Sequence, residues 1–401
     1  MAEGMGKPQR GLWSVLRRAA LGATMLLAAC TTGPRVVPAP ERPPAVERPV
    51  APPPIQPGLP QDVERHRIAL LVPLTGTNAG VGKSLQNATQ LAILDTRNDA
   101  IRITTYDTAG PGGAVAAAQQ AIAEGNRLIL GPLLAEDARA VAPIARRARV
   151  PVLSFSNDAN AAGDGTYLLG YVPSQSIDRV VRHARSAGIT EFAGLIPAGL
   201  YGERASTAFL RSVEEAGGRV LTLETFDARS GSLAAAIARL NRAPYQAVLI
   251  AGSADSAVAA VPVIRRAPAG KSARVLGTEL WNTDSSIGSR TALNGAWFAS
   301  VPDNYYRQYA TKYRARFGAA PYRLSTLGYD AVLLTVRIAR DWRPGTDFPE
   351  RRLTDRDGFA GLDGAFRFGR DGVAERALEV QEIRGGTTVT VSPAPANFSG
   401  N

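Results

Sequence analysis

The stretch from Arg67 to Asp95 most constrains how this chain can fold. It opens with a short apolar run, Ile68 to Val72, which has the length and composition of a buried strand. A loop rich in glycine and threonine follows, and apolar residues then recur at helical spacing on one face. A strand, a polar loop and a helix form the first half of a βαβ unit, in which ligands bind beside the carboxyl ends of the strands.

The loop after this first strand allows more than one interpretation. Gly82-Lys83-Ser84 before a helix resembles the end of a nucleotide-binding P-loop, whose pattern requires a glycine five residues before Gly82. That position is Thr77, so the phosphate-binding pattern is incomplete. A plain Gly-rich turn fits all of these residues, and a family resemblance described below gives a third interpretation.

Segments with strand and helix character alternate along the rest of the chain. In the first series, strands are expected at 68–72, 101–107, 127–130, 150–155 and 167–171, with helices at 113–123 and 135–148. After residue 172 the alternation restarts, with strands at 191–196, 219–226, 246–251 and 274–277 and helices at 174–187, 202–216, 233–242 and 253–266. Alternation predicts parallel sheets covered by helices on both faces, and the restart predicts two such domains.

The last part of the chain has a different pattern. Two long helices are expected close together, at 304–317 and 324–340. Residues 365–368 and 378–384 then alternate in polarity on either side of Asp371-Gly372, which predicts a β-hairpin.

Composition limits the classes of protein that this chain can belong to. Its 401 residues have room for two domains, and 45% hydrophobic with 20% charged residues is typical of a globular protein. The formal net charge is +11, but arginine is scattered rather than arranged in a basic run with interleaved aromatics. We therefore expect no nucleic-acid partner.

The N-terminus carries the most specific signal. Residues 1–29 combine a basic region with an apolar run that is too short to span a bilayer, as in an export signal. The run ends in Leu27-Ala28-Ala29-Cys30, which resembles the bacterial lipobox. Cys30 is the only cysteine, so it cannot form an internal disulfide. The resemblance implies cleavage before Cys30, lipidation of its thiol and anchoring in the cell envelope, with Thr31 favouring the outer membrane.

Residues 30–64 are predicted to be the lipid anchor and a tether. Eleven of the 28 prolines fall between Pro34 and Pro60. Proline lacks a backbone donor, so this segment cannot build a sheet or a helix. In an extended polyproline-like conformation the tether would reach up to about 100 Å.

Several landmarks after the tether are similar in order and spacing to the type I periplasmic binding protein fold, of the leucine-binding kind. They are Ile68 to Gly82, Ile129 to Leu133, Val150 to Ser154, Tyr201-Gly202-Glu203, Gly328 to Val332 and Gly364 to Phe368. The resemblance implies an α/β fold with two doubly wound parallel-sheet lobes joined by a three-strand hinge. Lobe one would comprise 65–172 plus 302–352, lobe two 173–301 plus 353–392, and 393–401 would form a tail.

Within this family, ligands bind in the cleft between the lobes. The resemblance places Thr75, Ser154 and Ser156 in the wall from lobe one, and Tyr201 and Glu279 in the wall from lobe two. Trp281 is a further aromatic candidate, although a tryptophan of the core fits the same position. Amino-acid receptors carry Ser or Thr in the loop after the third strand, whereas this chain has Leu133-Leu134, which suits a carboxylate poorly.

The lipoprotein subset of the fold, the penicillin-binding-protein activators, is a closer resemblance. It rests on Gly131-Pro132-Leu133 and on the phrase from Val152 to Asn157. We therefore expect a non-enzymatic, periplasm-facing lipoprotein that activates a peptidoglycan synthase. The alternative is a receptor that delivers an amino acid or another small ligand to an ABC permease. We expect no cofactor and no metal, since neither His66 nor His183 has partners at metal spacing.

Overall fold

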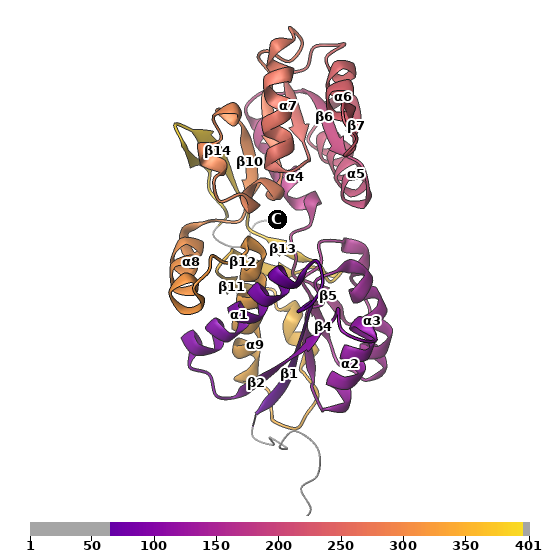
Figure 1. Cartoon of the computed structure of the whole chain (residues 1–401), viewed down its shortest axis with the longest axis vertical. Helices are drawn as coiled ribbons and strands as arrows, with labels where there is room; N and C mark the ends of the chain where they lie inside the picture. Colours follow the sequence, from indigo (N-terminus) through magenta and orange to yellow (C-terminus); the bar gives the residue numbers. More distant parts are fainter. Residues whose placement is uncertain (1–64, 396–401) are drawn as a thin grey trace, which may run out of the picture. The chain divides into compact units, whose positions relative to one another are not determined.

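The computed structural model describes residues 65–395, so Cys30 and the predicted tether lie outside the described residues. Lobe one contains a five-stranded parallel sheet in the order β2-β1-β3-β4-β5 (Figure 1). Its strands are β1 (His66–Val72), β2 (Ile101–Asp107), β3 (Leu128–Leu130), β4 (Val152–Ser154) and β5 (Thr166–Leu168). Its helices are α1 (Ala79–Thr96), α2 (Gly113–Ala123), α3 (Ala135–Arg147), α8 (Asn304–Phe317) and α9 (Thr326–Ala339).

Strand β1 lies inside the sheet, between β2 and β3, and both of its faces are buried. Ile68 and Leu70 join the apolar cluster that includes residues of α1, α8 and α9. Ala69 and Leu71 point to the other face, into the cluster formed with α2 and α3. A continuous apolar run is therefore required here, as in parallel sheets generally.

Lobe two contains a seven-stranded mixed sheet in the order β15-β14-β10-β9-β8-β6-β7. The strands are β6 (Glu191–Pro197), β7 (Arg219–Phe226), β8 (Ala247–Ile250), β9 (Arg274–Gly277), β10 (Trp297–Ser300), β14 (Glu379–Arg384) and β15 (Thr387–Ser392). The helices are α4 (Pro173–Ser186), α5 (Leu200–Glu215), α6 (Ser232–Leu240) and α7 (Ala254–Arg266). Strands β6 to β10 are parallel, whereas β14 and β15 are antiparallel to their neighbours.

Two α/β lobes of the type I periplasmic binding protein fold are therefore confirmed, but one expected boundary is wrong. The family resemblance implied that all of 353–392 belongs to lobe two. The first part of that range forms a separate three-stranded sheet, with strands β11 (Phe359–Gly361), β12 (Gly364–Phe368) and β13 (Ala374–Arg376). Phe359, Phe366 and Phe368 are buried in the core of lobe one, so the chain changes lobe only near Ala377.

The expected hairpin is also different from the one observed. Asp371 and Gly372 do form a turn, but β12 pairs with β13, at Ala374–Arg376. Residues 379–384 instead form β14, which pairs with β10 and β15 in the sheet of lobe two. Alternation of polarity showed that both segments are strands but could not identify their partners, because pairing depends on which lobe each segment joins.

Gly82 has a packing role that the sequence could not separate from a phosphate-binding role. A Cβ atom on Gly82 would lie 1.7 Å from the carbonyl oxygen of Pro73, so α1 approaches the end of β1 only because this residue is glycine. Lys83 donates a hydrogen bond to Gln86, and the Ser84 hydroxyl accepts one from the Tyr322 amide. The residues of the incomplete P-loop pattern thus have other structural roles.

Replacement of Gly82 by alanine should lower the free energy of unfolding by at least about 2 kcal/mol, because backbone must move to admit the methyl group. Urea denaturation of the purified protein measures this loss. Gly110→Ala is the matched control, since a Cβ there meets only ordinary contacts at 3.5 Å, and it should change stability by less than about 0.5 kcal/mol. Equal effects of the two changes would contradict the packing role.

Candidate functional site: the cleft between the lobes

A cavity of about 300 Å³ lies between the two lobes. Lobe one contributes a mainly apolar wall, formed by Asn78, Val81, Leu133, Leu134, Phe155, Asn157 and Leu324. Lobe two contributes a more polar wall, formed by Ser176, Glu279, Leu280, Asn282 and Thr283. The loops that follow β3, β4 and β9 supply much of both walls, as expected for ligand sites at the carboxyl ends of parallel strands.

The three hydroxyls expected in the wall of lobe one do not line this cavity. Ser154 is buried, and its Oγ donates to the Pro132 carbonyl (2.9 Å) and accepts from the Ser156 amide (3.2 Å). The Ser156 Oγ accepts from the Asp158 amide (3.1 Å). Thr75 is exposed outside the cavity and donates to Asp107 (2.8 Å). These hydroxyls organise the loops of lobe one, and the cavity meets Leu133 and Leu134 instead.

The two residues expected from lobe two are brought together. The Tyr201 hydroxyl donates to Glu279 Oε1 (2.9 Å), and Ser176 on α4 donates to Oε2 of the same carboxylate. Glu279 and Ser176 line the cavity, while Tyr201 lies behind them. Burial raises the pKa of Glu279, and the hydrogen bonds from Ser176 and Tyr201 oppose this rise. Glu279 is therefore the carboxyl group best placed to meet a donor on a ligand.

Trp281 belongs to the core of lobe two, which corrects its proposed place in the cleft. Its side chain is fully buried, packs near Phe298 with 6.0 Å between ring centroids, and donates from Nε1 to the Gly252 carbonyl (3.2 Å). The 3₁₀ turn at Glu279–Thr283 explains the difference, because it points Glu279 and Asn282 into the cavity and Trp281 into the lobe.

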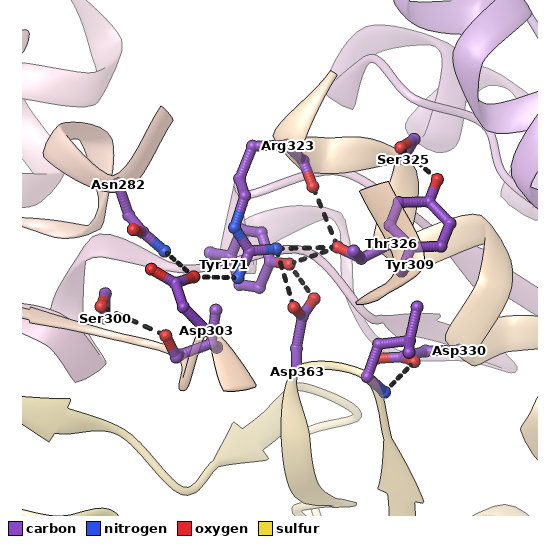
Figure 2. A network of polar contacts seen from close by, with 12 residues as sticks. Tyr171, Asn282, Ser300, Asp303, Tyr309, Arg323, Ser325, Thr326, Asp330 and Asp363 are labelled. Carbon is purple, nitrogen blue, oxygen red and sulfur yellow. Dashed lines mark hydrogen bonds and ion pairs between the residues drawn. The ribbon is translucent and has the colours of Figure 1, made fainter. Parts of the chain in front are cut away.

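Arg323, which lines the cavity, belongs to a buried ion pair that the sequence analysis missed (Figure 2). Arg323 Nη1 is 2.7 Å from Asp363 Oδ1, and both side chains are almost completely buried. Arg323 also contacts Asp303 at 3.3 Å. Tyr171 donates its hydroxyl proton to Asp363. Burial disfavours the charge on Asp363, but the guanidinium groups of Arg323 and Arg376 hold its pKa below the ordinary value.

This cluster joins the three segments that connect the lobes. Tyr171 lies in the first, between β5 and α4; Asp303 lies in the second, between β10 and α8; and Arg376 ends β13 just before the third. Arg376 donates to the Leu169 carbonyl (2.7 Å) and stacks over Tyr171 at 4.8 Å. We name these residues, with Arg323 and Asp363, the hinge cluster.

Direct contacts also cross between the lobes on both sides of the cavity. On one side Asp158 of lobe one accepts from Arg139 of its own lobe (2.7 Å) and lies 3.6 Å from Arg204 on α5 of lobe two. On the other side Asn282 donates to Asp303 (3.4 Å), as Figure 2 shows. The cavity is thus bordered by polar contacts that must break if the lobes separate.

Sequence reasoning missed the hinge cluster because its members are far apart in the chain. Arg323 and Asp363 are 40 residues apart, and Tyr171 is a further 152 residues before Arg323. Nothing local distinguishes a buried Arg–Asp pair from the many exposed ones. Asp330 lies near this cluster and is also fully buried. It accepts from the Leu362 amide (2.6 Å), and burial with the nearby Asp363 raises its pKa.

The described residues contain neither a candidate metal site nor a candidate membrane-spanning helix. Within residues 65–395 no group of three or more His, Cys, Asp and Glu side chains could hold a metal ion. No helix in the same part of the chain is long and apolar enough to cross a membrane.

Asp363→Asn should lower the free energy of unfolding by about 3 kcal/mol, because it leaves the buried Arg323 charge only partly compensated. Asp341→Asn is the control, since Asp341 pairs with Arg352 on the surface with side chains 63% and 51% exposed. That change should cost less than about 1 kcal/mol. Denaturant titration of both variants measures the difference. If Asp363→Asn lowers the free energy of unfolding no more than the control does, the hinge cluster does not stabilise the fold.

Glu279→Gln should alter how stability depends on pH. A carboxyl group whose pKa is raised by folding holds its proton in the folded state after the unfolded chain has lost it, so stability falls as pH rises above the ordinary value of 4.5. Glutamine removes this titration and can still accept from Tyr201. Thermal melts should therefore show a variant that gains stability over the parent as pH rises from acid to neutral; parallel curves would contradict the raised pKa.

Comparisons with known proteins agree with this architecture. A family model described as periplasmic binding protein matches residues 66–387. A Rhodospirillum rubrum protein assigned to branched-chain amino acid ABC transport has a similar structure, with a TM-score of 0.73, 20% identity, and coverage of 82% of this chain and 100% of that one. An ABC transporter substrate-binding protein from Sphaerobacter thermophilus gives a TM-score of 0.69 and 18% identity, covering 82% and 97% of the two chains.

Two further relatives share only part of their length with this chain. Full-length LpoA from Haemophilus influenzae gives a TM-score of 0.64 and 18% identity, with 82% of this chain and 60% of LpoA covered. An uncharacterised protein of Rickettsia prowazekii is 26% identical over 139 residues, which are 35% of this chain and 37% of that protein. Because the family model covers both lobes and the cleft between them, the chain belongs to the periplasmic binding protein family.

Proposed function

We propose that this protein is a non-enzymatic, lipid-anchored protein of the cell envelope that binds a peptidoglycan synthase and raises its activity. One observation carries the proposal: the wall from lobe one lacks the hydroxyl groups with which an amino-acid receptor of this family would hold its ligand. Ser154 and Ser156 are hydrogen-bonded to backbone groups, and Leu133 and Leu134 line the cavity. An unpaired ligand carboxylate against such a wall would be costly to bury.

Other observations support this function. The similarity to LpoA agrees with the resemblance to penicillin-binding-protein activators at Gly131-Pro132-Leu133. The lipobox at Cys30 and the proline-rich segment, both outside the described residues, fit a protein that is held at the outer membrane and reaches a partner some distance away. An activator needs a docking surface of about 800 Å² rather than a polar ligand site.

A receptor that delivers a small ligand to an ABC permease is the second candidate. The cavity favours it, because about 300 Å³ is the lower end of the usual range for ligand pockets. Glu279, with its partners Ser176 and Tyr201, offers a polar group to a ligand on the wall of lobe two.

A reconstituted assay separates the two candidates. The purified lipidated protein is added to each bifunctional penicillin-binding protein of the source bacterium, and polymerisation of lipid-linked precursor is followed. We expect a several-fold rise in rate with one of these synthases. A thermal-shift screen with amino acids runs beside it, because a ligand at 100 times its dissociation constant adds about 2.7 kcal/mol of stability.

The outcomes point in opposite directions. A rate increase without any thermal shift supports the activator. A clear thermal shift with an amino acid, together with unchanged synthase rates, would overturn it in favour of the receptor. Glu279→Gln is the matched variant, since it should abolish ligand-induced stabilisation in a receptor and leave activation of a synthase unchanged.

A further inference from the structure

The edge of lobe one that faces away from the cleft is made by the amino ends of its parallel strands. The loops after β3 and β4 line the cavity, so the opposite ends of the strands lie at the far edge of the sheet. The described fold begins there, at Arg65 just before β1 (lower part of Figure 1). The carboxyl ends of α1, α2 and α3 return to the same edge, because each helix connects one parallel strand to the next.

Exposed arginines gather at this edge from several elements. They are Arg97, Arg147, Arg149, Arg316, Arg340 and Arg343, which we name the basic end. Among the described residues none of these six lies within 4.0 Å of a carboxylate oxygen. They come from the ends of α1, α3, α8 and α9, so they are far apart in sequence.

Three shallow depressions lie along this edge between two of these arginines, Arg316 and Arg149. Arg316 lines the first together with Arg65 and Arg102. Arg65 also lines the second, with Arg127 and Gly345. Arg149 lines the third with Asp347, two residues after Gly345.

Four of the acidic groups at this edge are paired with nearby cations. Asp99, Glu124 and Glu350 also lie there but are fewer than the six arginines, so the edge keeps a positive charge. Asp95 pairs with Lys312 (3.0 Å), and Asp164 with Arg146 (2.9 Å). Asp347 pairs with Arg127 at 3.5 Å, and Asp341 pairs with Arg352. Favourable interaction with helix dipoles accounts for arginine in the last turn of a helix. It does not account for Arg149 or Arg343, which lie beyond the last turns of α3 and α9.

We propose that the basic end binds the anionic lipid headgroups of the membrane to which the chain is attached. The chain that precedes Arg65 leads through the proline-rich segment to Cys30, the predicted lipid site. The segment that carries the predicted lipid site therefore joins lobe one at the edge where the basic end lies. Attachment also raises the effective concentration of the surface near the bilayer, which adds to the binding that the arginines provide by themselves. Binding in this orientation directs the cleft away from the bilayer.

The strength of this interaction sets what an experiment should measure. Each arginine close to an anionic bilayer contributes about 1 kcal/mol, or roughly a fivefold change in partitioning. The effect should weaken strongly when salt rises from about 0.1 M to about 0.5 M, since the Debye length shortens.

Vesicle co-sedimentation tests the proposal without the lipid anchor. The chain lacking its predicted leader and carrying Cys30→Ser is mixed with vesicles of phosphatidylcholine, with or without about 30% phosphatidylglycerol. The test variant combines Arg149→Gln, Arg316→Gln and Arg343→Gln. The control variant combines Arg242→Gln, Arg266→Gln and Lys271→Gln, which removes the same charge from exposed positions of lobe two. Thermal melts establish that both variants are folded.

We expect salt-sensitive binding to the anionic vesicles, reduced more than tenfold in the test variant and less than threefold in the control. Equal losses in the two variants would show that only net charge matters and would overturn the proposal. Absence of binding to anionic vesicles would overturn it as well. Binding to isolated peptidoglycan that depends on the same arginines, without preference for the vesicles, would assign the basic end to the cell wall instead. None of these outcomes depends on whether the protein activates a synthase.

Discussion

The buried pair between Arg323 and Asp363 is the interaction on which the arrangement of the two lobes depends. Each lobe has apolar clusters of its own, so its fold does not require the other lobe. The connecting segments are short, and each places a polar side chain or an arginine beside this pair. A buried charge without a partner is strongly destabilising. Movement of any connecting segment would therefore disturb the groups that compensate the buried charges of Arg323 and Asp363.

Two arginines line the cavity, yet the cavity is not an evident anion-binding site. The hinge cluster explains why, because both arginines already have partners. Arg323 is held by Asp363 and Asp303, and Arg376 by the Leu169 carbonyl and the face of Tyr171. What remains for a ligand is a mainly apolar wall from lobe one and a more polar wall from lobe two, in which Glu279 supplies the carboxyl group. This combination differs from the hydroxyl-rich wall that the family resemblance implied, and it is the physical basis for preferring a protein partner over an amino acid.

Near the start of both lobes, a glycine allows a helix to pack closely against the end of the preceding strand. A Cβ on Gly82 would lie 1.7 Å from the Pro73 carbonyl oxygen, and one on Gly202 would lie 1.6 Å from that of Pro197. In each lobe the helix that follows the first strand, α1 or α5, can therefore approach the end of that strand. Parallel strands place these turns, and hence the cleft, at one edge of each sheet. In lobe one the opposite edge is left for the basic end and for the entry of the chain.

The sequence by itself determined the fold class, the two series of strands and helices, and most of their positions. These features depend on local patterns: apolar runs such as Ile68 to Val72, helical periodicity, and glycine at the turns. The lipobox and the proline-rich segment are also local, and they stay predictions because they lie outside the described residues. Among the predicted site residues, Tyr201 and Glu279 contact each other, since both follow strands of one sheet, but only Glu279 lines the cavity.

Only the tertiary structure decided the rest. Whether Trp281 faces the cleft or the core depends on a single 3₁₀ turn, and whether β12 and β13 join lobe one or lobe two depends on where three phenylalanines find apolar neighbours. Ser154 ends β4 and Ser156 follows it, and their hydroxyls form hydrogen bonds with backbone groups that no sequence pattern reveals. The Arg323–Asp363 pair and the basic end are assembled from distant segments, and burial and charge compensation between such segments exist only once the chain has folded.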